Sequence, residues 1–353
     1  MQKDSLEFLR EMIELPSPSG YEQPVQRVVR KRMSTFADEV KTDVHGNVCG
    51  SLNAKAPLRV MLAGHADEIG LMVTHIDGEG FVYFAVVGGI DQSLLPGSRV
   101  EIHTSGGVVP GVIGKKAIHL MDAKERDAVP KAKDLWIDIG ARSEKEAAKA
   151  VAVGDVATIV SSFQILRNDI AVARGFDDRI GAFIVTETLV ALSRKKPKVG
   201  VFSVSTVQEE IGLRGATTSA FSVDPHAGIA VDVGFASDFP GADKKQLGTV
   251  KLGDGPLLHR GANINPVLGE HLTSVARKKR IPYQMSAEPR ATGTDANAIQ
   301  LTRGGVAAAL LSVPNRYMHT PVELVSLKDV ENSVRLLTEA ILAMSPKMDF
   351  IPR

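Results

Sequence analysis

Residues 58–68 of the chain read Leu-Arg-Val-Met-Leu-Ala-Gly-His-Ala-Asp-Glu. The apolar run that ends at Gly64 is typical of a short buried strand. His65 and Asp67 follow directly, so an imidazole and a carboxylate leave the carboxyl end of that strand. Ligands of open α/β sheets bind at this edge, and a carboxylate beside a metal-bound histidine fixes its tautomer. The stretch predicts an α/β sheet with a candidate metal site, and the alternative is a solvated loop that carries these residue types by chance.

The sequence on either side of this strand continues the α/β pattern. Apolar residues at helical spacing predict two helices before residue 37, the first with a capping box formed by Asp4 and Glu7. From residue 174 onward, strands alternate with helical patterns. We expect helices over 179–193, 267–279 and 327–343, and strands over 198–207, 228–233 and 305–313.

The region from about residue 70 to 165 differs from its flanks. Short runs rich in Val and Ile are separated by glycine and proline turns, and one helical pattern lies near residues 144–151. This pattern predicts a small β-rich module inserted into the α/β domain. We therefore expect an α/β domain formed by residues 1–69 and 165–353, with an insertion over 70–164.

Composition narrows the classes of function. The chain has 353 residues, 42 Lys and Arg against 41 Asp and Glu, and a formal charge of +1. Such a balance gives no reason to expect nucleic acid or an anionic membrane as partner. No apolar run is long enough for a transmembrane helix, and residues 1–9 do not resemble a secretory signal. The single cysteine, Cys49, fits a reducing compartment, so we expect a cytoplasmic protein.

Four further segments carry acidic or histidine side chains near the ends of predicted elements. They contain Asp177 and Asp178, Glu209 and Glu210, Asp232, and His319. Each alone has an ordinary explanation as a helix cap or a turn. Together they predict a metal centre, because two histidines and several carboxylates suit Zn, Co or Mn, and a bridging carboxylate holds two ions about 3.5 to 4 Å apart. The remaining histidines lack this acidic context and are interpreted as structural: His75, His103, His119, His226, His259 and His271.

The order of these residues resembles a known family. The segments AGHADEIG (63–70), RGFDDRIGAF (174–183), VQEEIGLRGA (207–216), VDVG (231–234), ATGTDANAI (291–299) and RYMHTPVEL (316–324) are similar to those of the tetrahedral (TET) co-catalytic metallo-aminopeptidases. This family includes glutamyl aminopeptidases and proteins described as cellulase-M-like. The resemblance implies a mixed-sheet α/β exopeptidase domain interrupted by an inserted β-barrel, PDZ-like dimerisation domain. It also implies short peptides as substrates and self-association into a large homo-oligomer, commonly a hollow dodecamer.

The resemblance also implies roles for individual residues. Two divalent ions per subunit, with zinc favoured over cobalt or manganese, would be bridged by Asp177. One ion would be completed by His65 and Asp232, and the other by Glu210 and His319. Glu209 would be the general base, Asp67 would stand behind His65 as part of the catalytic set, and Thr294 and Asp295 would contact substrate.

Two other classes of function stay open on the sequence alone. One is a different hydrolase on the same scaffold, such as a deacylase or a glycosidase. Because a glycosidase needs two carboxylates and no metal, sensitivity to a chelator separates the two activities. The other is a catalytically silent assembly protein, which the intact set of ligand residues disfavours.

Overall fold

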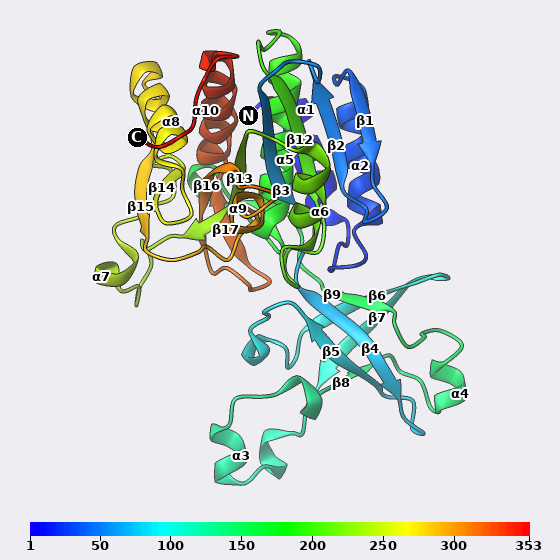
Figure 1. The fold of residues 1–353 in the computed structure, drawn as a ribbon. Helices are drawn as coiled ribbons and strands as arrows, with labels where there is room; N and C mark the ends of the chain where they lie inside the picture. The colour runs from blue at the N-terminus through cyan, green and yellow to red at the C-terminus, as the bar shows by residue number, and fades with distance from the viewer.

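The protein has two parts, which Figure 1 shows as an α/β body and a smaller barrel that projects from it. The structure is a computed structural model that describes residues 1–353. Each part has its own hydrophobic core: 58 buried residues cluster in the body and a separate 14 cluster in the barrel. The inserted module is therefore packed around side chains of its own.

A large mixed sheet forms the centre of the body, with the strand order β1-β2-β12-β3-β13-β16-β17-β11-β10. β14 adds to β16, and β15 pairs with β14. The strands are β1 (Glu39–Thr42), β2 (Val48–Leu52), β3 (Arg59–His65), β10 (Gln164–Ile165), β11 (Ile170–Ala173), β12 (Gly200–Thr206), β13 (Ala227–Phe235), β14 (Leu257–Gly261), β15 (Gln284–Glu288), β16 (Ala307–Arg316) and β17 (Glu323–Ser326).

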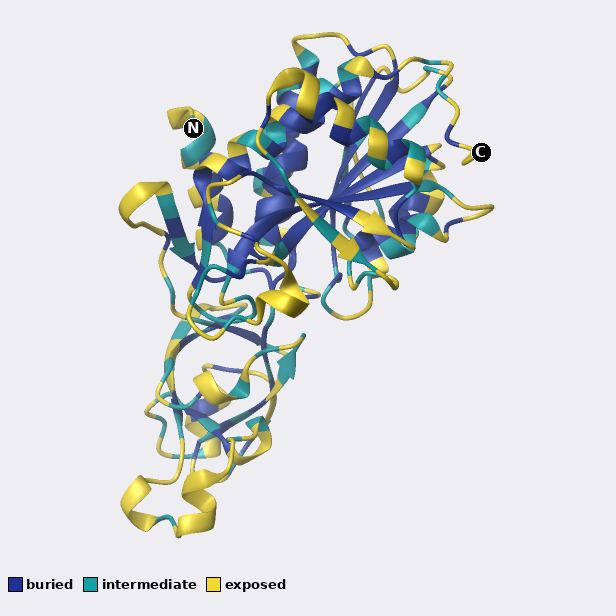
Figure 2. Cartoon of the chain, turned by 90° about the vertical axis from the view of Figure 1, so that its left-hand side faces the viewer, coloured by how far each residue is buried: buried dark blue, intermediate teal, exposed yellow.

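Four neighbouring strands in the middle of this sheet, β12, β3, β13 and β16, run parallel. They are almost continuously apolar and buried, as strands covered on both faces must be. Figure 2 shows them in the dark blue of buried residues. Because they are parallel, their carboxyl ends meet at one edge of the sheet.

Helices cover both faces of the sheet. They are α1 (Lys3–Glu14), α2 (Gln23–Ser34), α5 (Phe176–Ser193), α6 (Arg214–Val223), α7 (Lys244–Leu247), α8 (Pro266–Lys279), α9 (Asp295–Gln300) and α10 (Leu327–Ala343). Gly64 of β3 faces α5 so closely that a Cβ there would lie 2.3 Å from the carbonyl carbon of Gly181. Gly228 of β13 faces Ile299 of α9 instead. Gly228 is in register with Met61 of β3, so both residues face the same side of the sheet. Met61 and Gly64 are three residues apart on one strand and therefore face opposite sides, which places α5 and α9 on opposite faces of the sheet.

The barrel is closed by six antiparallel strands in the order β4-β5-β8-β7-β6-β9. These are β4 (Gly70–Ile76), β5 (Val82–Val87), β6 (Arg99–Thr104), β7 (Gly107–Gly114), β8 (Trp136–Asp138) and β9 (Val156–Ile159), with the short helices α3 (Ala123–Asp127) and α4 (Glu144–Ala147) between them. The chain around α3 is the exposed yellow tip in Figure 2. The expected fold class, an α/β sheet with an inserted β-barrel, is confirmed.

Individual elements agree with the sequence to within a few residues, with some differences. The predicted capping box is wrong: α1 begins at Lys3, so Asp4 lies inside the first turn, where its carboxylate pairs with Arg32. α5 starts three residues before the predicted helix and includes Asp177. No helix of the structure is both long and apolar enough to cross a bilayer.

Candidate metal centre

The residues singled out in the sequence converge at the carboxyl edge of the parallel strands. His65 is the last residue of β3, and Asp232 lies in β13. Asp177 lies in the first turn of α5, while Glu209 follows β12 and His319 follows β16. The parallel arrangement therefore explains how residues from distant parts of the sequence share one site.

Asp177 lies between the two histidines. Its Oδ1 is 3.3 Å from Nε2 of His65, and its Oδ2 is 3.2 Å from Nε2 of His319. Burial opposes ionisation of Asp177, yet the hydrogen bonds from His319 and His65 hold its pKa below the ordinary value. The hydrogen bond with Asp177 raises the pKa of His319 to about 10. One carboxylate thus presents a separate oxygen to each imidazole.

Asp178, joined to Asp177 by a cis peptide bond, takes a position that the sequence did not assign. Its Oδ2 accepts the backbone N–H of His65 at 3.1 Å, and its Oδ1 accepts that of Gly181 at 3.0 Å. Potential ligand atoms of His65, Asp178 and Asp232 lie within 4.8 Å of one another, as do those of His65, Asp177 and Glu210. Burial and the neighbouring Asp232 raise the pKa of Asp178 well above its usual range.

The two consecutive glutamates both point towards the histidines. Oε2 of Glu209 is 3.6 Å from Nε2 of His65, and Oε1 of Glu210 is 3.5 Å from Nε2 of His319. Burial raises the pKa of Glu209 to about 10 and that of Glu210 to about 8. Like charges crowded in a buried site require a counter-charge to remain ionised.

The donor set fits divalent metal ions. Oε1 of Glu210 is buried and has no hydrogen-bond partner, and the same holds for Oδ1 of Asp295. Buried polar atoms are nearly always paired, so the orphaned oxygen of Glu210, which belongs to a group of possible ligands, supports a bound cation. Imidazole with carboxylate oxygen suits zinc, cobalt and manganese. The site therefore contains candidate ligands for divalent metal.

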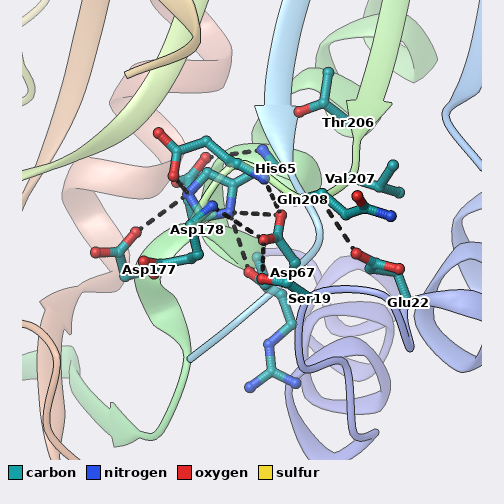
Figure 3. Close-up of polar contacts among 12 residues, drawn as sticks. Ser19, Glu22, His65, Asp67, Asp177, Asp178, Thr206, Val207 and Gln208 are labelled. Atoms are coloured by element: carbon teal, nitrogen blue, oxygen red, sulfur yellow. Dashed lines mark hydrogen bonds and ion pairs between the residues drawn. The ribbon is translucent and has the colours of Figure 1, made fainter. Parts of the chain in front are cut away.

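Asp67 organises the cluster from behind. Its Oδ2 accepts the hydroxyl of Ser19 at 2.7 Å and the backbone N–H of Glu210 at 3.1 Å, and its Oδ1 accepts the backbone N–H of Glu209 at 3.0 Å. Figure 3 shows the contacts that join Asp67 to Ser19 and His65. The nearest partner of His65 Nδ1 is the main-chain carbonyl of Asp67 at 3.0 Å, with the carboxylate at 3.3 Å. Asp67 thus holds both glutamates through their backbone and turns Nε2 of His65 towards Asp177.

Two further groups that the sequence did not single out orient His319. Nδ1 of His319 lies 2.8 Å from the carbonyl oxygen of Gly89, in the segment that follows β5 of the barrel. The buried carboxylate of Glu323 accepts the backbone N–H of His319 at 2.9 Å and that of Asp177 at 3.0 Å. The position of Glu323, four residues after a candidate ligand, is a signal that could have found it. A backbone carbonyl such as that of Gly89 leaves no trace in the sequence.

A cavity of about 790 Å³ opens onto the cluster. Asp177, Asp232 and Thr294 lie on its wall. Asp295 does not, because it is buried at the start of α9 with Oδ2 accepting the hydroxyl of Thr206 at 2.6 Å. Its assignment to substrate stays a prediction. His259, which the sequence placed among the structural histidines, also lines this cavity.

Comparison with known proteins identifies the family of the chain. The family model described as M42 glutamyl aminopeptidase matches residues 46–336. A lysyl aminopeptidase from Pyrococcus furiosus is 39% identical over 98% of this chain and 99% of its own length. The crystal structure of a TET aminopeptidase from a marine sediment Thaumarchaeota archaeon superimposes with a TM-score of 0.93 at 36% identity, over 97% of this chain and 98% of the other.

Another solved structure is that of a TET1 peptidase from Pyrococcus horikoshii, which is described as able to assemble into a tetrahedron or a large octahedral shell. It superimposes with a TM-score of 0.87 at 33% identity, over 96% of this chain and 100% of the other. The family model spans most of the sequence, and these relatives match it end to end with the same two-part fold. The expected resemblance is confirmed: the chain belongs to the M42 glutamyl aminopeptidase family of peptide hydrolases.

Proposed function

We propose that the protein is a dinuclear metal-dependent aminopeptidase that removes N-terminal residues from short peptides. The observation that carries the proposal is the placement of Asp177 between His65 and His319, with one oxygen facing each Nε2. A carboxylate in this position suits two ions in a co-catalytic pair. Asp232 would complete the ligands on the side of His65, and Glu210 those on the side of His319.

The protein side chains then have separate tasks. Bound divalent ions supply a water of lowered pKa and a polarised scissile carbonyl. Glu209 accepts the proton of the attacking water and returns it to the leaving amine. The raised pKa of Glu209 supports a role for cations, since nearby positive charge favours the ionised carboxylate that a base must provide. Asp67 keeps Glu209 and Glu210 in place through their backbone N–H groups.

The glycosidase alternative is less well supported by the site. It needs one protonated carboxylic acid and one ionised carboxylate on either side of a sugar, without metal. Here five carboxylates lie around His65 and His319, which exceeds what that chemistry uses. We therefore favour the peptidase, and zinc as its metal, with cobalt or manganese as the alternatives.

The oligomeric assembly of the chain is proposed from one relative and from exposed residues of the barrel. The Pyrococcus horikoshii relative is described as a tetrahedron or octahedral shell, and exposed apolar residues such as Leu120 and Val129 lie at the tip of the barrel. We propose that residues 70–164 form a dimerisation domain and that the chain assembles into a large homo-oligomer, as a dodecamer, in the cytoplasm. Light scattering that gives a monomer at micromolar concentration would contradict the assembly.

The activity is tested with a panel of aminoacyl chromogenic substrates, assayed before and after treatment with a chelator. We expect release that stops on chelation and returns with Zn, Co or Mn, with up to two metal ions bound per chain. An N-acetylated peptide serves as the control, because an aminopeptidase requires a free terminal amine. Full activity in metal-free protein, or cleavage of the blocked peptide, would overturn the proposal.

A further inference from the structure

A second group of polar side chains lines the cavity away from the metal centre. Glu288, the last residue of β15, accepts a hydrogen bond at 3.1 Å from Nδ1 of His259 and one at 3.0 Å from Ser286. Nε2 of His259 lies 2.9 Å from the hydroxyl of Ser312 on β16. All four residues belong to the cavity wall. None of them is used in the proposed mechanism.

These contacts fix the position of a negative charge. An ionised carboxylate only accepts hydrogen bonds, so Nδ1 of His259 donates to Glu288, and Nε2 is free to accept the hydroxyl of Ser312. The histidine therefore fixes the orientation of the Glu288 carboxylate. The hydrogen bond from His259 lowers the pKa of Glu288, whose side chain is 32% exposed towards the cavity. The carboxylate is therefore charged, oriented and accessible.

The rest of the cavity wall carries no compensating charge. No lysine or arginine lies among its residues. The other carboxylates on the wall, Asp177, Glu209, Glu210 and Asp232, belong to the proposed metal centre, whose ions would offset their charge. Between the two polar ends the wall is apolar, with Val233, Val250, Leu257 and Leu310. A substrate side chain that extends from the metal centre into the cavity therefore passes apolar residues first and then reaches the carboxylate of Glu288.

The register of the strands gives the length of this passage. Asp232 of β13 is paired with Ser312 of β16, and Ser312 is paired with Leu257 of β14. Neighbouring strands lie about 4.8 Å apart, and the imidazole of His259 reaches back to Ser312 at 2.9 Å, so the carboxylate on its far side lies about 10 Å from Asp232. Only a long side chain spans this gap. Lysine and arginine combine that length, an apolar stem and a terminal cation.

We propose that Glu288 is a specificity-determining residue that selects peptides with a basic N-terminal residue, and that His259 positions its carboxylate. This inference rests on the proposed aminopeptidase function. A glutamyl side chain is rejected, because it would face Glu288 with no cation on the wall to pair with it. A hydrophobic side chain fills the passage but leaves the carboxylate without a partner.

The first test uses the wild-type enzyme with lysyl and norleucyl p-nitroanilides. Their apolar stems are matched in length, so the comparison isolates the terminal charge. We expect kcat/KM to be about 10- to 100-fold higher for the lysyl substrate, the usual effect of a hydrogen bond to a charged group. The glutamyl substrate should be the poorest of the three. A norleucyl substrate that is turned over as well as the lysyl one would overturn the inference.

The second test uses Glu288→Gln, which keeps the size of the side chain and an oxygen for His259. The lysyl-to-norleucyl ratio should fall at least about tenfold, mainly through KM, since the charge acts in binding. Glu270→Gln, on the exposed face of α8, is the matched control and should keep the wild-type ratio. An unchanged ratio in Glu288→Gln would reject the role of Glu288.

The outcomes separate this inference from the proposed function. If no aminoacyl substrate is hydrolysed with any added metal, the aminopeptidase itself is refuted. If metal-dependent hydrolysis occurs without preference for basic residues, only the assignment of Glu288 fails. The wild-type comparison needs no variant, so it can overturn the preference for basic residues even if Glu288→Gln does not fold.

Discussion

Replacing Asp67 by asparagine tests how the cluster is held in place. The carboxylate accepts the hydroxyl of Ser19 and the backbone N–H groups of Glu209 and Glu210, with distances of 2.7 to 3.1 Å. Asparagine has one carbonyl oxygen where aspartate has two acceptors. Whichever way its amide turns, the NH₂ group faces the backbone N–H of either Glu209 or Glu210. One buried donor is then unpaired.

The size of the effect follows from that donor. An unsatisfied buried N–H costs about 1 to 3 kcal/mol. A free-energy difference of about 1.4 kcal/mol corresponds to a factor of ten. If the whole cost of the unpaired N–H weakens metal binding, the affinity for metal falls by about 5- to 150-fold. The range overlaps the 10- to 100-fold loss of affinity that usually follows removal of a group behind a metal ligand. His65 keeps its contact with the main-chain carbonyl of residue 67, so we expect the loss of metal affinity to lie near the lower end of this range.

The assay is a titration of metal-free protein with zinc, by calorimetry or by competition with a chromogenic chelator. Asp67→Asn should bind zinc about tenfold more weakly than the wild type. Ser19→Ala is the matched control, since it removes a side-chain donor to the same carboxylate and leaves both backbone contacts intact; its affinity should stay near that of the wild type. If Asp67→Asn bound zinc within threefold of the wild type, the reasoning from the backbone contacts would be refuted.

Three further predictions concern other parts of the molecule. Glu209→Gln should lower kcat by about 10² to 10⁴ with metal retained, whereas Glu210→Ala should lose metal; kinetics and metal analysis that give the reverse pattern would exchange the two roles. Glu68→Ala leaves two buried guanidinium groups unpaired and should cost about 3 to 5 kcal/mol, seen as a clear drop in melting temperature; an unchanged melting temperature would contradict it. Burial raises the pKa of Asp329 to about 6, above the value of an unfolded chain, so its contribution to stability is present below about pH 4 and is lost as pH rises to about 6. The difference in unfolding free energy between wild type and Asp329→Asn should therefore shrink by about 2 to 3 kcal/mol over this interval, and a difference independent of pH would refute the assignment.

The elements that the sequence predicted are those with a strong period or a long apolar run. The strand before His65 and the helix over 327–343 are examples, since burial on one or both faces leaves a pattern in the residues. The short helix α9 (Asp295–Gln300) left no such pattern, because six residues are too few to show a helical period. Its position beneath the sheet is set by tertiary packing.

The candidate site shows the same division. Side chains at the ends of parallel strands could be grouped in advance, because the topology brings those ends together. The role of Asp178 could not be predicted, since two adjacent aspartates are alike in sequence. Only the backbone turn decides which way each side chain points. His259 has no acidic context in the sequence, because its partners Glu288 and Ser312 lie 29 and 53 residues further along the chain. Nothing near it in sequence marked it as part of the cavity.

Through the contact between His319 and the carbonyl of Gly89, the inserted barrel helps to orient a side chain of the candidate metal centre. A neutral imidazole with its proton on Nδ1 offers its lone pair at Nε2, so the acceptor supplied by Gly89 selects the tautomer that a metal ligand needs. A shortened enzyme without the barrel, made to obtain a small monomeric catalyst, would lose this acceptor along with any assembly surface. Reduced activity in such a truncation could therefore not be ascribed to the loss of quaternary structure alone. An engineer who wants to remove the barrel must first provide another carbonyl or carboxylate for Nδ1 of His319.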